Sequence, residues 1–225
     1  MTLTPDEWEV VRLSLQVGGA AMAGVLPIAF ALAWALARWR FPGKLLVDGI
    51  VHLPLVLPPV VTGWLLLIAF APGGPLALLG DRVLFRWTGA AIAAAVMALP
   101  LMVRAMRLSI EAVDPRLENA ARTLGAGRWR VFRTIVLPLS MPGILAGVVL
   151  GFARALGEFG ATITFVSNIP GETRTLPLAI YGALQLPGGE GAVLRLVLVS
   201  VALSLGALVA SEMLARRAGR GLHAL

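Results

Sequence analysis

The sequence predicts an all-α integral membrane protein with about five transmembrane helices. Of its 225 residues, 58% are hydrophobic and only 14% are charged, whereas a soluble domain has about 45–50% apolar and about 25% charged residues. The mean hydropathy is +0.87. The apolar residues gather in five runs, each near the roughly 20 residues that a helix needs to cross the hydrocarbon core. This composition excludes a soluble globular protein.

The predicted spans follow one another in a single transmembrane domain. They cover approximately residues 13–36, 45–70, 88–106, 139–163 and 192–214. We expect the first span to remain in the mature protein, because Asp6, Glu7 and Glu9 stand where a cleaved signal peptide carries positive charge. No internal repeat and no Ser/Gly-rich linker divides the chain. We therefore expect one domain, 1–225, with a membrane core of about 11–214.

The charged residues between the spans predict the orientation. Lys and Arg number 19 against 12 Asp and Glu, which gives a net charge of +7. The cations cluster between apolar runs, which is typical of membrane orientation signals and not of a nucleic-acid-binding surface. Connections rich and poor in cations alternate, and the third holds Arg107, Arg116, Arg122, Arg128, Arg130 and Arg133. The positive-inside rule then predicts an N-terminus outside and a C-terminus inside.

The residue inventory gives little support to catalysis or metal binding. The chain has no cysteine, and its two histidines are His52, near a span end, and His223, in the tail. Asp48 lies i, i+4 from His52, and such a lone membrane histidine is more often a satisfied core residue than a ligand. No nucleophile and base can be brought together from this set. We expect no catalytic site, no metal site and no cofactor.

The segment 114–138 between the third and fourth spans is polar yet patterned, and it predicts two short helices. Asp114 can cap the first helix, Pro115 fits its first turn, and Glu118 complements the positive end of its dipole. Glycines at 125 and 127 interrupt the pattern, and a second amphipathic stretch, 129–137, is expected to stop at Pro138. Such a basic hairpin could adhere to anionic lipid headgroups or dock on a cytoplasmic partner.

The stretch ENAARTLGAGRWRVFRTIVLP resembles the signature loop of ABC-importer permeases. That loop has a Glu-Ala-Ala triplet, a glycine four residues later, and a closing Ile-x-Leu-Pro. Asn119 stands in place of the expected Glu, and Glu118 comes one residue earlier. The resemblance implies that the hairpin is a coupling element that docks on a separate ATPase subunit. The residues implied are Glu118, Asn119, Ala120, Ala121, Gly125, Ile135, Leu137 and Pro138.

Three further segments are similar to permease subunits of molybdate importers. They are HLPLVLPPVVTGWLLL, AAAVMALPLMVRAMRLSIE and ARALGEFGATITFVSNIPGETRTLP. Sulfate and tungstate permeases share the GEFGA and NIPG elements, so these two ions remain alternative substrates. The resemblance implies a type I importer permease fold in the bacterial inner membrane, surrounded by lipid. It also implies a second permease copy, forming a homodimer, and a periplasmic oxyanion-binding protein.

ATP hydrolysis is expected to come from a separate pair of ATPase subunits. A phosphate-binding loop ends in Gly-Lys-Ser/Thr, and the only lysine, Lys44, lacks the following hydroxyl residue. A secondary transporter would need its own coupling-ion site, usually within repeated halves, and the chain shows no such symmetry. The chain is therefore expected to be a transport subunit and not an enzyme.

Several residues within the spans are candidates for the transport pathway. Arg154 and Glu158 are spaced i, i+4 on one predicted helix face, and charges in a span need a partner or a purpose. They form either a structural ion pair or an anion-attracting pair, with Thr162 and Thr164 as nearby donors. Pro58 and Pro59 predict a kink that is either structural or part of a gate.

One stretch is predicted to pack against another helix without contacting substrate, and a second is predicted not to cross the membrane. Gly143, Gly147, Gly151 and Ala155 recur every four residues, a spacing that lets membrane helices approach closely. The apolar stretch 176–186 is too short to cross, and it either lies at the interface or dips back into the protein.

Overall fold

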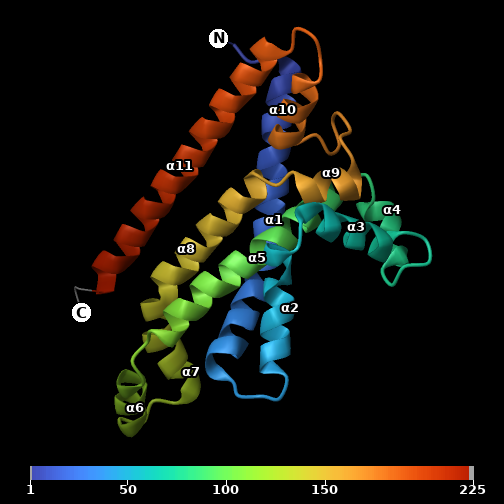
Figure 1. Ribbon diagram of the computed structural model, residues 1–225. Coiled ribbons are helices and arrows are strands. Elements are labelled where there is room, and N and C mark those ends of the chain that lie inside the picture. The colour runs from blue at the N-terminus through green and yellow to red at the C-terminus, as the bar shows by residue number, and fades with distance from the viewer. Residues whose placement is uncertain (1, 223–225) are drawn as a thin grey trace.

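The structure is a computed structural model that describes residues 2–222, so His223 in the predicted tail lies outside the described residues. All regular elements within this range are helices (Figure 1). Their bounds are α1 Pro5–Arg38, α2 Lys44–Val56, α3 Pro59–Phe70, α4 Gly80–Val83, α5 Trp87–Glu111, α6 Pro115–Thr123, α7 Arg128–Val131, α8 Leu137–Leu156, α9 Gly160–Val166, α10 Leu176–Leu184 and α11 Glu190–Leu222, with a 3-10 turn at Ala77–Leu79 and a π-helical turn at Phe132–Val136. The prediction of an all-helical fold is confirmed.

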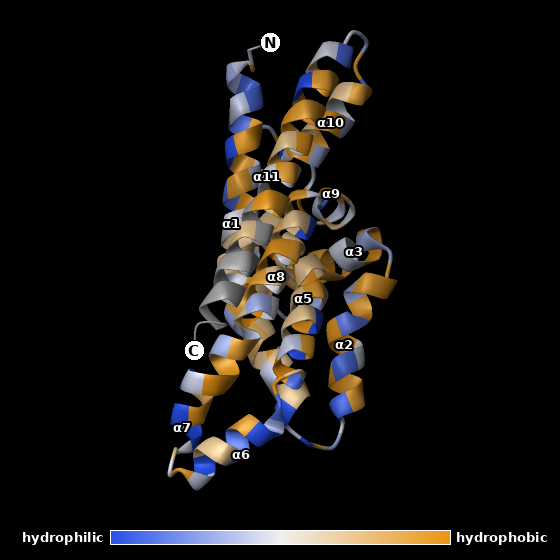
Figure 2. Ribbon diagram, turned by 90° about the vertical axis from the view of Figure 1, so that its left-hand side faces the viewer, coloured by the Kyte–Doolittle hydropathy of each residue, from blue (hydrophilic) through white to orange (hydrophobic). Residues whose placement is uncertain are grey.

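Among the residues that the structure describes, four helices are long and apolar enough to cross a membrane on their own. They are Pro5–Arg38, Trp87–Glu111, Arg128–Leu156 and Glu190–Val209. Figure 2 shows hydrophobic residues along these helices, and hydrophilic residues gathered at α6, at α7 and at the N-terminal end of α1. The remaining predicted span, 45–70, consists of α2 and α3.

The helices α2 and α3 are not one straight span, because they meet at an angle of 115°. A residue that precedes proline is driven out of the helical region. Leu57 precedes Pro58 and has ψ 142°, and Pro58 precedes Pro59 and has ψ 134°. Two consecutive extended residues turn the predicted kink into a break, and α3 begins at Pro59, where a proline is well tolerated.

The fourth predicted span, 139–163, is wrong at both ends. Helix α8 ends at Leu156, and α9 is a separate short helix. At the other end the helix does not stop at Pro138. Instead, the chain is helical from Arg128 to Leu156, and a π-helical turn at Phe132–Val136 precedes the proline. The wider turn accommodates a residue without a backbone N–H near the first turn of α8.

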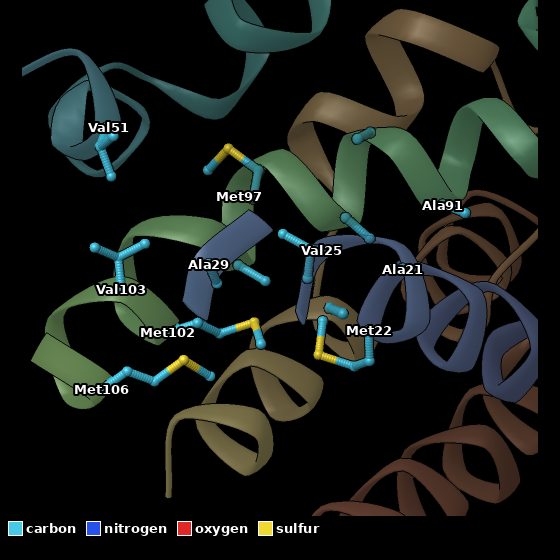
Figure 3. Packing of buried hydrophobic residues seen from close by; sticks show 14 of the residues in the cluster. Ala21, Met22, Val25, Ala29, Val51, Ala91, Met97, Met102, Val103 and Met106 are labelled. Atoms are coloured by element: carbon cyan, nitrogen blue, oxygen red, sulfur yellow. The ribbon is translucent and has the colours of Figure 1, made fainter. Parts of the chain in front are cut away.

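Helix α5 lies between α1 and α8 and forms the centre of the protein. Figure 3 shows methionines of α5 beside small side chains of α1. Met97, Met102 and Met106 are almost fully buried. The alanines at these contacts are equally inaccessible: Ala29, Ala33, Ala90, Ala93, Ala94 and Ala98. Small residues allow backbones to approach closely, which in lipid gives van der Waals contact that apolar burial alone does not supply.

The predicted packing role of the glycine stripe on α8 is confirmed. A Cβ atom built on Gly147 would lie 3.2 Å from the Met102 carbonyl oxygen and 3.3 Å from Met106 Cγ. One built on Gly151 would lie 2.6 Å from Met102 Cγ, and one on Gly143 would collide with Ser109. The stripe therefore faces α5 at contact distance.

Helix α11 contacts α8 and α10 but has little buried surface. Only 6% of its membrane window is buried, and Figure 1 shows it leaning away from α1 and α5. Its first turns are held by Arg195, whose Nη2 lies 2.8 Å from Glu7 Oε1 of α1. The short stretch 176–186 forms α10, whose Leu176 amide donates to the Ser14 hydroxyl at 2.7 Å. Leu176 and Leu178 are buried, so α10 dips into the protein.

We expect Gly147→Leu to destabilise the fold, because the new side chain would enter the contact between α8 and α5. Overpacking of a core costs about 1–3 kcal/mol. The measurement is the fraction of detergent-extracted protein that elutes as one species, together with its melting temperature. The control is Gly19→Leu, since nothing lies within 4 Å of a Cβ atom at Gly19. Equal yield and melting temperature of the two variants would contradict the packing role.

Candidate functional site

The hairpin between α5 and α8 begins with the cap that the sequence predicts. The Asp114 carboxylate accepts a hydrogen bond from the Arg116 amide at 2.8 Å, and Pro115 occupies the first turn of α6. Both features are confirmed. The hairpin lies at the end of the molecule opposite to the N-terminus (Figure 1).

Helix α6 ends at a Schellman turn that requires Gly125. The Gly125 amide donates to the Arg122 carbonyl at 3.0 Å, and the Ala126 amide donates to the Ala121 carbonyl at 3.0 Å. This pair of hydrogen bonds requires a left-handed backbone conformation at Gly125, whose φ is +85°. A residue with a side chain is disfavoured there. The glycine of the signature loop therefore fixes the direction in which the chain leaves α6.

The residues expected at the docking surface differ in exposure. Asn119, Ala120 and Gly125 are exposed, whereas Ala121, Ile135, Leu137 and Pro138 are half-buried. Three apolar side chains of the hairpin are also exposed, Leu117, Leu124 and Trp129. Trp129 lines a hollow with Trp34 of α1, so Leu117 and Leu124 are the two that remain for contact with a partner protein. Glu118 differs from the rest of the set, because it is buried.

Glu118 faces the membrane helices and not the outer surface of the hairpin. Its Oε1 lies 2.6 Å from Arg38 Nη1, at the end of α1. Arg38 also donates from Nη2 to the Ile110 carbonyl of α5 at 3.2 Å. On α6 itself, Arg122 Nη2 lies 3.3 Å from Glu118 Oε2. Arg38 thus connects α1, α5 and the hairpin, a contact that the sequence analysis did not anticipate.

The predicted pairing of Arg154 with Glu158 is confirmed, but the two residues are not on one helix. Arg154 Nη1 lies 2.6 Å from Glu158 Oε2, while Glu158 lies beyond the end of α8, in the break before α9. Its Oε1 accepts a hydrogen bond from the Ala161 amide at 2.8 Å. The Glu158 side chain is 2% exposed and that of Arg154 is 26% exposed. Glu158 thus fixes the break, and Arg154 is its more accessible partner.

The segment around this break packs against α3. A Cβ atom at Gly160 would lie 2.8 Å from Pro59 Cβ, and one at Gly63 would collide with the backbone of Ala161. Pro58 and Pro59 therefore place α3 directly against α9. Two segments far apart in the sequence meet here, and they are two of those that carry the family resemblance.

The polar side chains after Glu158 are mostly engaged within the protein. The Thr164 hydroxyl donates to the Gly160 carbonyl at 2.9 Å, and Thr162 is 2% exposed. The Asn168 amide group donates to the Leu178 carbonyl at 3.1 Å and accepts from Arg174 Nε at 3.0 Å. From the sequence we expected Thr162 and Thr164 to be donors for an anion. In the structure the Thr164 hydroxyl bonds to its own helix α9, and Asn168 holds α10 in place.

A second charged group, which the sequence analysis missed, lies between α2 and α5. Arg107 Nη1 is 3.0 Å from Asp48 Oδ2, and Arg107 Nε is 2.8 Å from Glu111 Oε1. His52 Nδ1 is 3.1 Å from Asp48 Oδ1, so the expectation of a satisfied histidine is confirmed. The sequence did contain a signal for this charged group, because Arg104 stands inside an apolar run, three residues before Arg107.

The chain matches the family model described as "Binding-protein-dependent transport system inner membrane component" over residues 26–220. It is 57% identical to "Molybdenum transport system permease protein ModB" of Escherichia coli (strain K12), covering 98% of this chain and all of that protein. The protein of the same name from Haemophilus influenzae is 55% identical, covering 94% of both chains. "Sulfate transport system permease protein CysT" of Escherichia coli (strain K12) is 42% identical over 68% of this chain and 57% of its own length.

Solved structures of ABC transporters have the same fold. A bacterial ABC transporter involved in the import of the acidic polysaccharide alginate matches with a TM-score of 0.71 at 18% identity, covering 97% of this chain and 80% of that one. The MetNI methionine ABC transporter in an inward-facing conformation matches with a TM-score of 0.69 at 16% identity, covering 94% of both chains. At these identities the likeness concerns the fold alone.

We expect Arg38→Gln to loosen the hairpin without unfolding the membrane helices. The change leaves Glu118 without its partner on α1, and a hydrogen bond to a charged group contributes about 1.5–3 kcal/mol. Amide hydrogen exchange within α6 should accelerate roughly tenfold to a hundredfold, while exchange in the centre of α5 stays the same. Arg40→Gln is the control, because Arg40 is exposed two residues away. Unchanged exchange in α6 would contradict the anchoring role of Arg38.

We expect Arg154→Gln to reduce the amount of folded protein, because it leaves the buried Glu158 carboxylate without its cation. Removing one partner of a buried ion pair costs about 3–5 kcal/mol. The double variant Arg154→Gln/Glu158→Gln carries no unpaired charge and should recover most of the loss. The measurement is the melting temperature in detergent. If the double variant melted no higher than the single one, burial of an unpaired charge would not be the cause.

Proposed function

The chain belongs to the family of binding-protein-dependent transport system inner membrane components, and from this premise we propose that it is the permease subunit of a molybdate importer. One observation carries the proposal. The identity of 57% extends over 98% of the chain and over the full length of a relative whose name states molybdenum transport. Sulfate is the second candidate substrate, because the sulfate permease is also a relative, but it matches a smaller part of the chain.

The subunit is a multi-pass membrane protein that moves its substrate with energy supplied by other subunits. In the proposal, two ATPase subunits bind the hairpins of two permease copies. The exposed apolar side chains around Asn119 and Gly125 support this surface, because docking would bury them. The anchor from Glu118 to Arg38 then transmits hairpin motion to α1 and α5.

The proposed orientation places the hairpin in the cytoplasm of a bacterial cell and the N-terminus in the periplasm. Six arginines between the third and fourth spans support this assignment under the positive-inside rule. The opposite end carries α10 and the loop before it, which offer a surface to a periplasmic oxyanion-binding protein. The exposed membrane face of α11 would be covered by lipid or by the second permease copy in a homodimer.

The proposed pathway runs past the break between α8 and α9. Arg154 is the accessible member of its ion pair and would attract an oxyanion, while Glu158, Thr162 and Thr164 hold the surrounding backbone. Pro58 and Pro59 place α3 against this break, so a movement of α3 could act as a gate. Uptake by the double variant Arg154→Gln/Glu158→Gln should fall even when its fold is intact, and normal uptake would restrict the pair to a structural role.

The function is tested by ATP hydrolysis in proteoliposomes that contain this chain, its ATPase and its binding protein. We expect molybdate to stimulate hydrolysis more than tungstate or sulfate does. Gly125→Asp should abolish co-purification of the ATPase and the stimulation, because it places a negatively charged side chain on the exposed surface of the hairpin at a position whose φ of +85° favours glycine. The matched control is Gly127→Ala, where φ is −67° and nothing lies within 4 Å of a Cβ atom.

The outcomes separate the substrate from the transporter type. Stimulation by sulfate alone would replace molybdate with sulfate and leave the importer intact. An ATPase that neither co-purifies with the wild-type chain nor responds to any oxyanion would overturn the docking role of the hairpin.

A further inference from the structure

An aromatic hollow between α1 and the hairpin takes no part in the function described above. Its volume is about 550 Å³, within the range of about 300–1,000 Å³ that is usual for pockets that bind small molecules. Apart from one alanine, it is lined by five aromatic side chains and one cation: Phe30, Trp34, Trp39, Trp129, Phe132 and Arg128. Three of the six tryptophans of the chain therefore lie around one space.

The walls of the hollow are fixed by contacts between α1 and the hairpin. Trp34 of α1 meets Phe132 edge to face, with 5.1 Å between the ring centroids. Trp129 of α7 stacks on the same Phe132 at 5.2 Å. Both arrangements are favourable for aromatic pairs. The Arg38 guanidinium also lies 5.7 Å from the centroid of the Trp34 ring, so the end of α1 holds this wall in place.

The hollow extends from the end of α1 toward the membrane interior. Trp39 follows Arg38, the last residue of α1, and Phe30 lies eight residues before Arg38, or about 12 Å along the helix. Helix α1 is one of those long and apolar enough to cross a membrane. Tryptophan is enriched where such helices meet water, because indole combines an apolar ring with a polar N–H. Trp39 and Trp129 are 58% and 67% exposed, so both rings are open to a neighbour at this level.

The charges at the hollow are positive. Arg128 lines it, and the Arg133 guanidinium lies 6.0 Å from the centroid of the Trp129 ring. Both arginines are exposed, and neither takes part in an ion pair among residues 2–222. The lining includes no acidic residue. The hollow therefore offers apolar walls together with cations that have no anion beside them.

We propose that this hollow binds an anionic phospholipid, whose acyl chain lies against the aromatic walls and whose phosphate is held by Arg128. The guanidinium group can donate two parallel hydrogen bonds to a phosphate, and Arg133 adds positive potential. Basic pockets beside membrane helices are typical sites for anionic headgroups. A lipid in this place touches both α1 and the hairpin, so it strengthens the connection that Arg38 makes with Glu118. The inference goes beyond the proposed function and holds whichever ion is transported.

Two other occupants are a partner protein and a second copy of the chain. A water-soluble subunit does not reach the part of the hollow that lies at membrane depth along α1. We favour a lipid over a second copy, because a phospholipid supplies an anion and an apolar chain in one molecule, and the hollow places cations and apolar walls side by side.

The test measures quenching of tryptophan fluorescence by lipids with brominated acyl chains, in nanodiscs that hold the full-length chain in unlabelled phosphatidylcholine. Brominated phosphatidylglycerol is compared with brominated phosphatidylcholine of the same acyl chains. We expect half-maximal quenching at a lower mole fraction of phosphatidylglycerol, and we expect Arg128→Gln to raise that fraction roughly fivefold. The control is Arg116→Gln, because Arg116 is an exposed arginine of the same hairpin that does not line the hollow.

A second variant, Ala31→Phe, tests the apolar part of the site. Ala31 lines the hollow and is exposed on α1, so a larger side chain fills the hollow without entering the protein core. All arginines are kept, yet the preference for phosphatidylglycerol should be lost. Ala23→Phe is the control, because Ala23 is equally exposed on α1 and lies outside the hollow.

Three results would overturn the assignment. Equal half-quenching fractions of the two lipids in the wild type would exclude an anionic ligand. An effect of Arg128→Gln without one of Ala31→Phe would place the headgroup on the hairpin surface and not in the hollow. If Ala31→Phe separated a permease dimer, measured as the mass of the particle by light scattering, and left the lipid preference unchanged, the occupant would be the second copy. Failure of the proposed function is separate, because it would appear as absence of oxyanion-stimulated hydrolysis in the wild type.

Discussion

The close contact of α5 with α1 and α8 is the interaction on which the other elements depend. In lipid the hydrophobic effect gives little drive for helices to associate, so stability comes from dense van der Waals contact. The buried alanines of α1 and α5 and the glycines of α8 allow that density. Methionines of α5 fill the irregular gaps that remain. The shorter helices α3, α9 and α10 are then positioned on a centre that is already fixed.

Both interruptions of helical structure occur where neighbouring groups satisfy the freed backbone. Irregular backbone at membrane depth is tolerated only when it is buried in protein or lines a water-filled cavity. The break between α8 and α9 receives the Glu158 carboxylate, and the bend between α2 and α3 is covered by α9 through Gly63 and Gly160. Each break therefore depends on the other, which makes α3 and α9 one structural unit.

Much of the fold could be predicted from the sequence, because membrane thickness fixes the length of each apolar run. The cap at Asp114 and the interruption of the helix at Gly125 could also be predicted, since both depend on neighbours in the chain. The angle between α2 and α3 was not, because it requires the backbone angles of Leu57 and Pro58. Contacts between residues that are far apart in the sequence could not be predicted either. Arg38 and Glu118 are 80 residues apart in the sequence, and no periodicity connects them.

The continuity of α7 with α8 has a mechanical consequence. Residues Arg128–Leu156 form one helix of 29 residues, which at 1.5 Å per residue is a rod about 43 Å long. One end carries the hairpin surface and the other carries the joint at Glu158. In the proposed transporter, a movement of the hairpin would therefore reach this joint through uninterrupted helix. The π-helical turn at Phe132–Val136 is the one departure from α-helical geometry that is assigned between these two ends, and it lies close to the hairpin.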